Sequence, residues 1–429
     1  MSHVSDRFDV RENTLIGETF YYTTHPTGVR IVVCPKPEIK TYYATFATKY
    51  GSIDNEFRVN GGEFTRVPDG IAHYLEHKLF ESEDGDTFQR FEKTGACANA
   101  FTSREKTGYY FSCTRYFDQA FEILLDFVQK PYFTPENVQK EQGIIAQEIK
   151  MSQDSPGRKV STNLMKAMYR DHPIRDDVAG TVESIAQITP ELLYKCYNTF
   201  YNPNNMVLAV SGNVDPQQVL AMCDKLLLPR ERLEIERRIP EDDGKIVQPF
   251  IEEECDVPFP IFQLGFKERW REMSAREGIL SGLIRKSVFG SISDFYDRMI
   301  RKKLINPGFG YSSVDVRGAL ASVFKGVSRS PESLRDEIFE EIERVKRDGI
   351  PPRIFECARR SCFGAIISCF NYTEDIADNL QDDIMFDVDT FAAIKAATDV
   401  TVEEANELFR RQYDITNSSL SVVRRSKEA

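Results

Sequence analysis

The sequence predicts an α+β protein built from two similar domains, each an antiparallel-rich mixed sheet layered with helices. Three observations predict this class. The chain has 429 residues, about twice the usual size of one domain. Short strand-like runs alternate with longer helical patterns, and their order in the first half recurs in abbreviated form in the second. Between the halves, Pro229–Pro249 is rich in Arg, Glu and Asp and has proline at both ends, which is typical of a linker. We therefore expect domains over residues 1–228 and 250–429, joined by a linker over residues 229–249.

The first half begins with strand-like runs that are rich in Tyr, Val and Thr. A glycine-containing loop then leads into a helical pattern over Ile71–Phe80, where the short acceptor side chain of Asp69 could cap the first turn. A hairpin-like pair of strands, Cys97–Thr102 and Gly108–Cys113, comes next. The other elements expected are strands at Phe20–Thr23, Arg30–Cys34, Tyr42–Thr48 and Met206–Gly212, and helices at Thr87–Lys93, Phe117–Val128, Thr134–Ser152, Ser161–Tyr169, Pro190–Phe200 and Pro216–Leu227.

The second half repeats this rhythm with fewer elements. It begins with a strand at Phe262–Phe266 and ends with a strand at Ser419–Val423, in the place that Met206–Gly212 holds in the first half. Between them we expect strands at Gly310–Val316 and Leu320–Val327, helices at Ser274–Val288 and Ile292–Lys303, and helices that begin at Glu332, Pro352, Thr373 and Thr401. The matching order predicts that the two halves fold alike.

Composition argues for a globular protein of the cytoplasm. Hydrophobic residues make up 41% and charged residues 28%, and the net charge is −12, which is unfavourable for a general binder of nucleic acids or anionic membranes. No apolar run approaches the ~18 residues that a membrane span needs, and the first residues lack a basic-then-apolar secretion pattern. The nine cysteines include no CxxC pair, so we expect reduced, mostly buried thiols.

Two of the five histidines fall in one short motif, His73-Tyr74-Leu75-Glu76-His77. Positions i and i+4 of a helix share one face, about 5–6 Å apart at Cβ, so His73 and His77 can bind one Zn²⁺. Glu76 lies on the same face, where it can act on a metal-bound water. The order H-x-x-E-H is the inverzincin signature of zinc peptidases.

A catalytic zinc site needs three protein ligands, so a third must come from elsewhere in the chain. The helix predicted over Thr134–Ser152 carries Glu141 and Glu148, seven residues apart on one face, and Ile144 and Ile145 between them can pack it against its neighbours. One carboxylate could bind zinc and the other could hydrogen-bond a ligating histidine. The residues alone leave open which is which.

Together with the run Asn99–Thr102, these motifs resemble the M16 family of zinc metallopeptidases, the family of pitrilysin and insulysin. The chain is most similar to the bacterial YmfH-like branch of that family, on further segments such as Tyr50–Asp54 and Ala179–Ile185. The resemblance extends over essentially the whole chain, and it is strongest between residues 40 and 215.

The resemblance implies a fold, a reaction and a set of roles. The fold is that of the LuxS/MPP-like metallohydrolases, with an N-terminal zinc-binding peptidase domain and a C-terminal domain of the inactive type. One zinc per chain is assigned to His73, His77 and Glu148, the general base to Glu76 and a supporting role to Glu141. The strand Asn99, Ala100, Phe101, Thr102 is implied to receive a peptide substrate as an added β-strand. The implied activity is an endopeptidase acting on short or unfolded peptides, within a homodimer or a heterodimer with a paralogue.

One part of the family pattern is altered. Active members carry an Arg and a Tyr seven residues apart in the C-terminal half, whereas Arg301 and Tyr311 are ten residues apart here. Either a longer loop still lets Arg301 reach the substrate or a partner chain supplies the pair. The alternative function is therefore a non-catalytic or half-active peptide-binding subunit that needs a paralogous partner. A structural zinc protein fits poorly because such sites are closed and rich in cysteine. We expect His172 to be a loop residue without a catalytic role.

Overall fold

The structure, a computed structural model, describes residues 7–83 and 85–425. The chain divides into two compact units. The first comprises Met1–Gln147, Val178–Arg238 and Ile366–Phe391, and the second comprises Glu148–Asp177, Ile239–Ala365 and Ala392–Ala429. Neither unit is continuous in sequence, unlike the ranges 1–228 and 250–429 expected from the sequence. Within the described residues, no helix is both long and apolar enough to cross a membrane.

The first unit is built on a seven-stranded sheet of order β1-β2-β3-β11-β4-β10-β9. Its strands are β1 (Asp9–Asn13), β2 (Glu18–Thr24), β3 (Arg30–Pro35), β11 (Met206–Gly212), β4 (Tyr42–Thr48), β10 (Thr107–Cys113) and β9 (Cys97–Thr102). All neighbours are antiparallel except β11 and β3, which are parallel. β11 is buried along its whole length, which explains its continuous apolar sequence. β9 forms one edge of the sheet.

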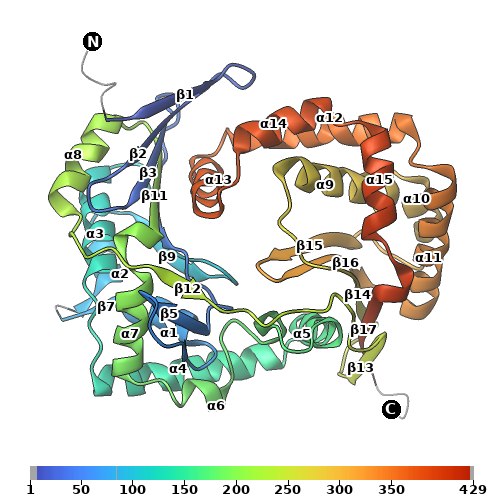
Figure 1. Cartoon of the computed structure of the whole chain (residues 1–429), viewed down its shortest axis with the longest axis horizontal. Helices are drawn as coiled ribbons and strands as arrows, with labels where there is room; N and C mark the ends of the chain where they lie inside the picture. The colour runs from blue at the N-terminus through green and yellow to red at the C-terminus, as the bar shows by residue number, and fades with distance from the viewer. Residues whose placement is uncertain (1–6, 84, 426–429) are drawn as a thin grey trace. The chain divides into compact units, whose positions relative to one another are not determined.

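Helices α3 and α8 cover one face of this sheet, as Figure 1 shows. α3 buries apolar residues at helical spacing, among them Phe117, Phe121, Leu124 and Val128, so one stripe of the helix is apolar. The helices of the first unit in the N-terminal half are α1 (Ile71–Leu79), α2 (Thr87–Glu92), α3 (Phe117–Gln129), most of α4 (Pro135–Gln153), α6 (Val182–Ile185), α7 (Pro190–Phe200) and α8 (Pro216–Leu226), with a 3₁₀ turn at Pro203–Asn205. A further 3₁₀ turn, Pro173–Arg175, belongs to the second unit.

The opposite face of the sheet is covered by α13 (Thr373–Phe386), which comes from the C-terminal part of the sequence (Figure 1). Gln381 is fully buried and donates to the backbone oxygens of Thr45 and Val207, at 3.1 and 3.2 Å. Met385 is also fully buried, in a cluster with Val207. These contacts place residues 366–391 in the first unit, although the sequence predicted the whole range 250–429 as one domain.

Short strands add two small sheets. β12 (Ile235–Arg237), β5 (Glu56–Val59) and β6 (Thr65–Arg66) form one, and β7 (Glu81–Ser82) and β8 (Gly85–Asp86) form the other. β12 lies inside the stretch expected to be a linker, so part of that stretch is ordered by pairing with β5. Arg237 there makes an ion pair of 3.2 Å with Asp54, which is fully buried.

The second unit has a five-stranded sheet of order β13-β17-β14-β16-β15. Its strands are β13 (Phe250–Glu254), β17 (Ser418–Arg424), β14 (Ile261–Glu268), β16 (Ala319–Val327) and β15 (Gly310–Val316). β13 and β17 are parallel and the other neighbours are antiparallel. The sheet therefore repeats the arrangement β3-β11-β4-β10-β9 of the first unit, which confirms the predicted α+β fold with two similar domains.

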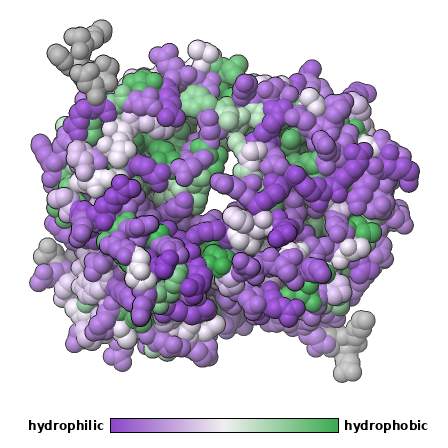
Figure 2. Space-filling view, in the orientation of Figure 1, coloured by the Kyte–Doolittle hydropathy of each residue, from purple (hydrophilic) through white to green (hydrophobic). Residues whose placement is uncertain are grey.

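Helices also enclose the second sheet. α5 (Pro156–Met168) packs closely against β14, where a Cβ on Gly265 would lie 2.4 Å from the sulfur of Met168. The other face carries a large apolar cluster that includes Phe266, Leu283 and Ile338. The remaining helices are α9 (Ala275–Phe289), α10 (Asp294–Arg301), α11 (Pro331–Asp348), α12 (Pro352–Cys369), α14 (Thr390–Asp399) and α15 (Val402–Gln412), with a 3₁₀ turn at Ile415–Asn417. Hydrophilic residues predominate on the surface shown in Figure 2.

Candidate metal centre

Helix α1 begins at a position that only glycine fits easily. Gly70 is the N-cap residue with φ of 89°, and a Cβ there would lie 2.4 Å from the backbone oxygen of Ala179. The expectation that Asp69 caps the helix is wrong. Its carboxylate instead accepts a hydrogen bond of 2.6 Å from Asn55, and its backbone oxygen accepts one of 2.8 Å from Ser184. The direction of α1 is therefore set by loop contacts rather than by a side-chain cap.

Side chains of α1 hold it against α4. The Tyr74 hydroxyl donates to the backbone oxygen of Val138, and the fully buried ammonium of Lys78 donates to that of Asn137 at 3.3 Å. Lys78 also pairs with Glu81. Because these bonds fix two successive turns of α1 to α4, the histidines on the adjoining face are held in place relative to the carboxylates of α4.

One face of α4 is buried in its contact with α1. Val138, Ile145 and Ile149 are buried, at helical spacing, whereas Ile144 is 48% exposed. The expectation that Ile144 packs the helix is therefore wrong, and Ile145 takes that role together with Ile149. Glu141 is 7% exposed and lies on the same face, one turn before Ile145.

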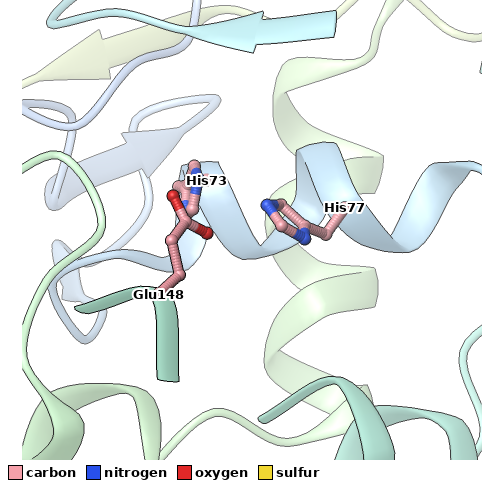
Figure 3. Close-up of side chains that lie close together, drawn as sticks. All are labelled: His73, His77 and Glu148. Carbon is pink, nitrogen blue, oxygen red and sulfur yellow. The ribbon is translucent and has the colours of Figure 1, made fainter. Parts of the chain in front are cut away.

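His73, His77 and Glu148 meet at one point, shown in Figure 3. Each offers one ligand atom, and these atoms all lie within 4.8 Å of one another. The two imidazole rings have centroids 4.6 Å apart. The division between the two units falls beside Glu148, but α4 is one continuous helix, so this carboxylate is carried by the same helix as Glu141. Two imidazoles and one carboxylate are a donor set that catalytic zinc sites use, so these three side chains could hold a metal ion.

Glu141 contacts one of these histidines and is not part of the three-residue group. Its Oε1 lies 3.0 Å from Nδ1 of His77. Burial acts to raise the pKa of Glu141, but the hydrogen bond and charge of His77, with Lys78 and Lys140 nearby, outweigh burial and hold that pKa below its usual value. A hydrogen bond donated by Nδ1 leaves Nε2 as the ring atom with a lone pair for a metal. Glu148 thus lies with the two histidines and Glu141 contacts His77 from outside that group, while the roles that the resemblance implies for them stay predictions.

Glu76 is tied to the edge strand of the sheet. The hydroxyl of Thr102, the last residue of β9, donates to Oε2 of Glu76 at 2.6 Å. The other predicted substrate contacts lie on the same strand. Asn99 Oδ1 accepts a hydrogen bond from the backbone nitrogen of Ala100. The ring of Phe101 packs over Gly108, where an added Cβ would lie only 2.8 Å from the ring. No sequence signal pointed to the contact between Thr102 and Glu76, which are 26 residues apart.

Arg301 and Tyr311 belong to the second unit. Arg301 is the last residue of α10, exposed to solvent, and its Nε donates to the backbone oxygen of Asp297 at 3.3 Å. Tyr311 is partly buried in β15, the edge strand of the second sheet, and burial raises its pKa. Their predicted contact with substrate stays a prediction.

His172 and four of the cysteines are buried. His172 is 1% exposed, accepts a hydrogen bond from the backbone nitrogen of Ile174 at the start of a 3₁₀ turn, and contacts the backbone oxygen of Arg317. The cysteines are free thiols, of which Cys34, Cys113, Cys196 and Cys223 are buried. Burial raises the pKa of Cys113 to about 11, so this thiol is a poor nucleophile near neutral pH.

Comparison with protein families identifies the class. The family model described as insulinase (peptidase family M16) matches residues 58–182, and the model of the peptidase M16 inactive domain matches residues 187–362. The first includes the histidine motif and both carboxylates of α4. The chain belongs to peptidase family M16, and the resemblance noted in the sequence is confirmed.

Within the family, the chain is similar to YmfH-like proteins and, more distantly, to pitrilysin. The chain is 36% identical over 404 residues to the uncharacterized zinc protease YmfH of Bacillus subtilis, covering 92% of this chain and 94% of that protein. The structure of a putative M16-like peptidase from Alicyclobacillus acidocaldarius is similar with a TM-score of 0.92, 32% identity and 98% and 99% of the two chains covered. Pitrilysin shares the fold, with a TM-score of 0.76 at 16% identity over 97% of this chain and 46% of its own.

Proposed function

We propose that this chain is a zinc-dependent endopeptidase that hydrolyses peptide bonds of short or unfolded peptides. The observation that carries the proposal is the meeting of His73, His77 and Glu148 within 4.8 Å, with a further carboxylate, Glu76, on the same turn of α1. Membership in a peptidase family and relatives that are named zinc proteases support the same reaction.

The three side chains suit one zinc ion per chain. A zinc ion bound there would act as a Lewis acid towards the peptide carbonyl and would lower the pKa of a water molecule towards neutrality. His73, His77 and Glu148 would hold it, and Glu141 would orient His77 through the bond of 3.0 Å. The chemistry of the donor set argues against a closed structural site, because such sites usually have four ligands and are rich in cysteine.

Glu76 is the proposed general base. Its carboxylate takes the proton of the attacking water and returns it to the leaving amine, which must be protonated for the C–N bond to break. It adjoins His77 in sequence, so α1 holds it beside the metal ligands. The hydrogen bond from Thr102 restrains this carboxylate.

The edge of the sheet is the proposed binding site for substrate. β9 pairs with β10 on one side and ends the sheet on the other, so an extended peptide can add to it through main-chain hydrogen bonds. Asn99, Ala100, Phe101 and Thr102 would lie along that peptide. Extended segments with unpaired backbone groups are abundant in short or unfolded chains, whereas folded proteins protect most of theirs, which is why we propose short or unfolded chains as substrates.

A second chain is proposed to complete the enzyme, either another copy or an M16 paralogue, in the cytoplasm. This chain matches 46% of pitrilysin, so pitrilysin is about twice as long, which supports the pairing of two such chains. Arg301 and Tyr311, of this chain or its partner, would contact the substrate. The spacing of ten residues between them favours one alternative, a half-active subunit that needs a paralogous partner.

The experiment compares wild type, Glu76→Gln and Glu92→Gln, an exposed glutamate of α2 that serves as the matched control. Bound zinc and cleavage of a mixed peptide library are measured on each purified chain. We expect about one zinc per chain in all three and cleavage in wild type and Glu92→Gln only. Zinc without cleavage in wild type would favour the half-active alternative, and a chain without zinc would refute the proposal.

A further inference from the structure

A threonine of the edge strand contacts the proposed base. Thr102 Oγ1 donates to Glu76 Oε2 at 2.6 Å, a short bond of the kind that hydroxyls make to carboxylates. A hydrogen bond at Oε2 restrains the rotation of the carboxylate about its side chain. We propose that Thr102 is the positioning residue of Glu76, an inference that rests on the proposed function and deepens it.

The hydroxyl of Thr102 comes from a well-fixed point of the sheet. Thr102 pairs across the hairpin with Thr107 of β10, which is fully buried and donates to the backbone oxygen of Tyr50 at 2.9 Å. Adjacent residues of the turn accept backbone bonds of 3.0 Å from Ser52 and Ile53. A side chain held by its surroundings in this way can orient a second group precisely because little of its own freedom remains to be lost.

Close backbone packing strengthens this anchorage. A Cβ on Gly51 would lie 2.3 Å from the backbone of Arg104 and Glu105, so the loop before β5 is pressed directly onto the hairpin turn. On the other side Lys106 forms an ion pair with Asp382 of α13 and lies 5.1 Å from the ring centre of Phe101. Elements on both sides therefore fix the end of β9.

The alternation of side chains along β9 separates two tasks. Successive residues of a strand point to opposite faces, so Thr102 shares a face with Ala98 and Ala100, while Asn99 and Phe101 lie on the other. The hydroxyl of Thr102 is used on Glu76, whereas an added peptide would bind through the backbone of the strand edge. The same strand would thus bind substrate and hold the base, so that the two stay in register during each turnover.

The test replaces the hydroxyl without changing the shape of the side chain. Thr102→Val removes the donor, Thr102→Ser keeps it, and Thr87→Val is the control, since the buried hydroxyl of Thr87 has no hydrogen-bond partner. With an unstructured, internally quenched peptide, we expect Thr102→Val to lower kcat by roughly 10–100-fold, in line with the cost of removing a group that orients a metal ligand. KM and zinc content should stay at the wild-type values, Thr102→Ser should recover most of kcat, and Thr87→Val should behave as wild type.

A structural measurement keeps this inference separate from the proposed function. Crystal structures of zinc-loaded wild type and Thr102→Val show the position of the Glu76 carboxylate whether or not the chain cleaves the peptide. We expect the carboxylate to leave its wild-type position or to occupy several. An unmoved carboxylate, an unchanged kcat, or equal losses in the Val and Ser variants would overturn the role of Thr102. Absence of cleavage by zinc-loaded wild type would instead favour the half-active alternative for the chain, and the crystal structures would still decide the role of Thr102.

Discussion

Glu141 and Glu148 are both carboxylates of α4 with different contacts, and zinc affinity can test the different roles proposed for them. Glu141 is 7% exposed and lies 3.0 Å from Nδ1 of His77. Glu141→Gln keeps an acceptor oxygen at this distance and loses the negative charge, whereas Glu141→Ala loses both. Since groups that orient a metal ligand are typically worth 10–100-fold in affinity, we expect the zinc Kd to rise roughly tenfold for Gln and nearer a hundredfold for Ala.

The assay is competition for zinc against a chromophoric chelator at one pH, with Glu148→Ala and the exposed Glu136→Gln measured alongside. Removal of a ligand should cost more than removal of its neighbour, so Glu148→Ala should have the weakest binding and Glu136→Gln should match wild type. A zinc Kd unchanged in both Glu141 variants would refute the reasoning. So would a larger loss for Glu141→Ala than for Glu148→Ala, because Glu141 would then be the ligand.

Two further predictions concern α13. Met385 is fully buried against the sheet. Met385→Ala should therefore lower the free energy of unfolding by about 2–5 kcal/mol, measured by denaturant titration. A loss under about 1 kcal/mol would mean that α13 does not pack on the sheet as described. Burial, with the charges of Asp382 and Asp389, raises the pKa of Asp383 to about 7, whereas an unfolded Asp titrates near 3.9. Between about pH 4 and 7 the folded chain then holds a proton that the unfolded chain has released, so this group makes stability fall as pH rises. Asp383→Asn should stabilise the chain more at pH 8 than at pH 5, and equal effects at the two pH values would contradict the assignment.

Several strands were predictable from the sequence. The expected ranges Cys97–Thr102, Met206–Gly212 and Gly310–Val316 are those of β9, β11 and β15. The sequence did not indicate β1 or β12, because these strands are short, charged and exposed and depend on the strand with which each pairs. The position of α13 could not be predicted either, because it depends on contacts between residues more than 300 positions apart, such as Gln381 with Thr45.

The candidate site was predictable where its chemistry is local. The spacing of His73 and His77 on one helix was enough to place them together, and the structure brings Glu148 to the same point. The positions of Glu141 and Glu148 on one face of α4 do not predict which of them lies opposite which histidine. That depends on the relative position of α1 and α4, which the hydrogen bonds of Tyr74 and Lys78 fix. The contact of Thr102 with Glu76 depends on where β9 ends beside α1. The spacing of apolar residues along the sequence does not predict that position.

The central claim is that His73, His77 and Glu148 bind one zinc ion, and X-ray anomalous scattering from crystals of the zinc-loaded chain tests it most directly. The account predicts one peak per chain above the zinc edge, about 2.0–2.2 Å from one atom of each of the three side chains. Glu141 should remain bonded to His77 and lie outside the coordination shell. A peak bound by Glu141 in place of Glu148, or the absence of any peak between α1 and α4, would contradict the account.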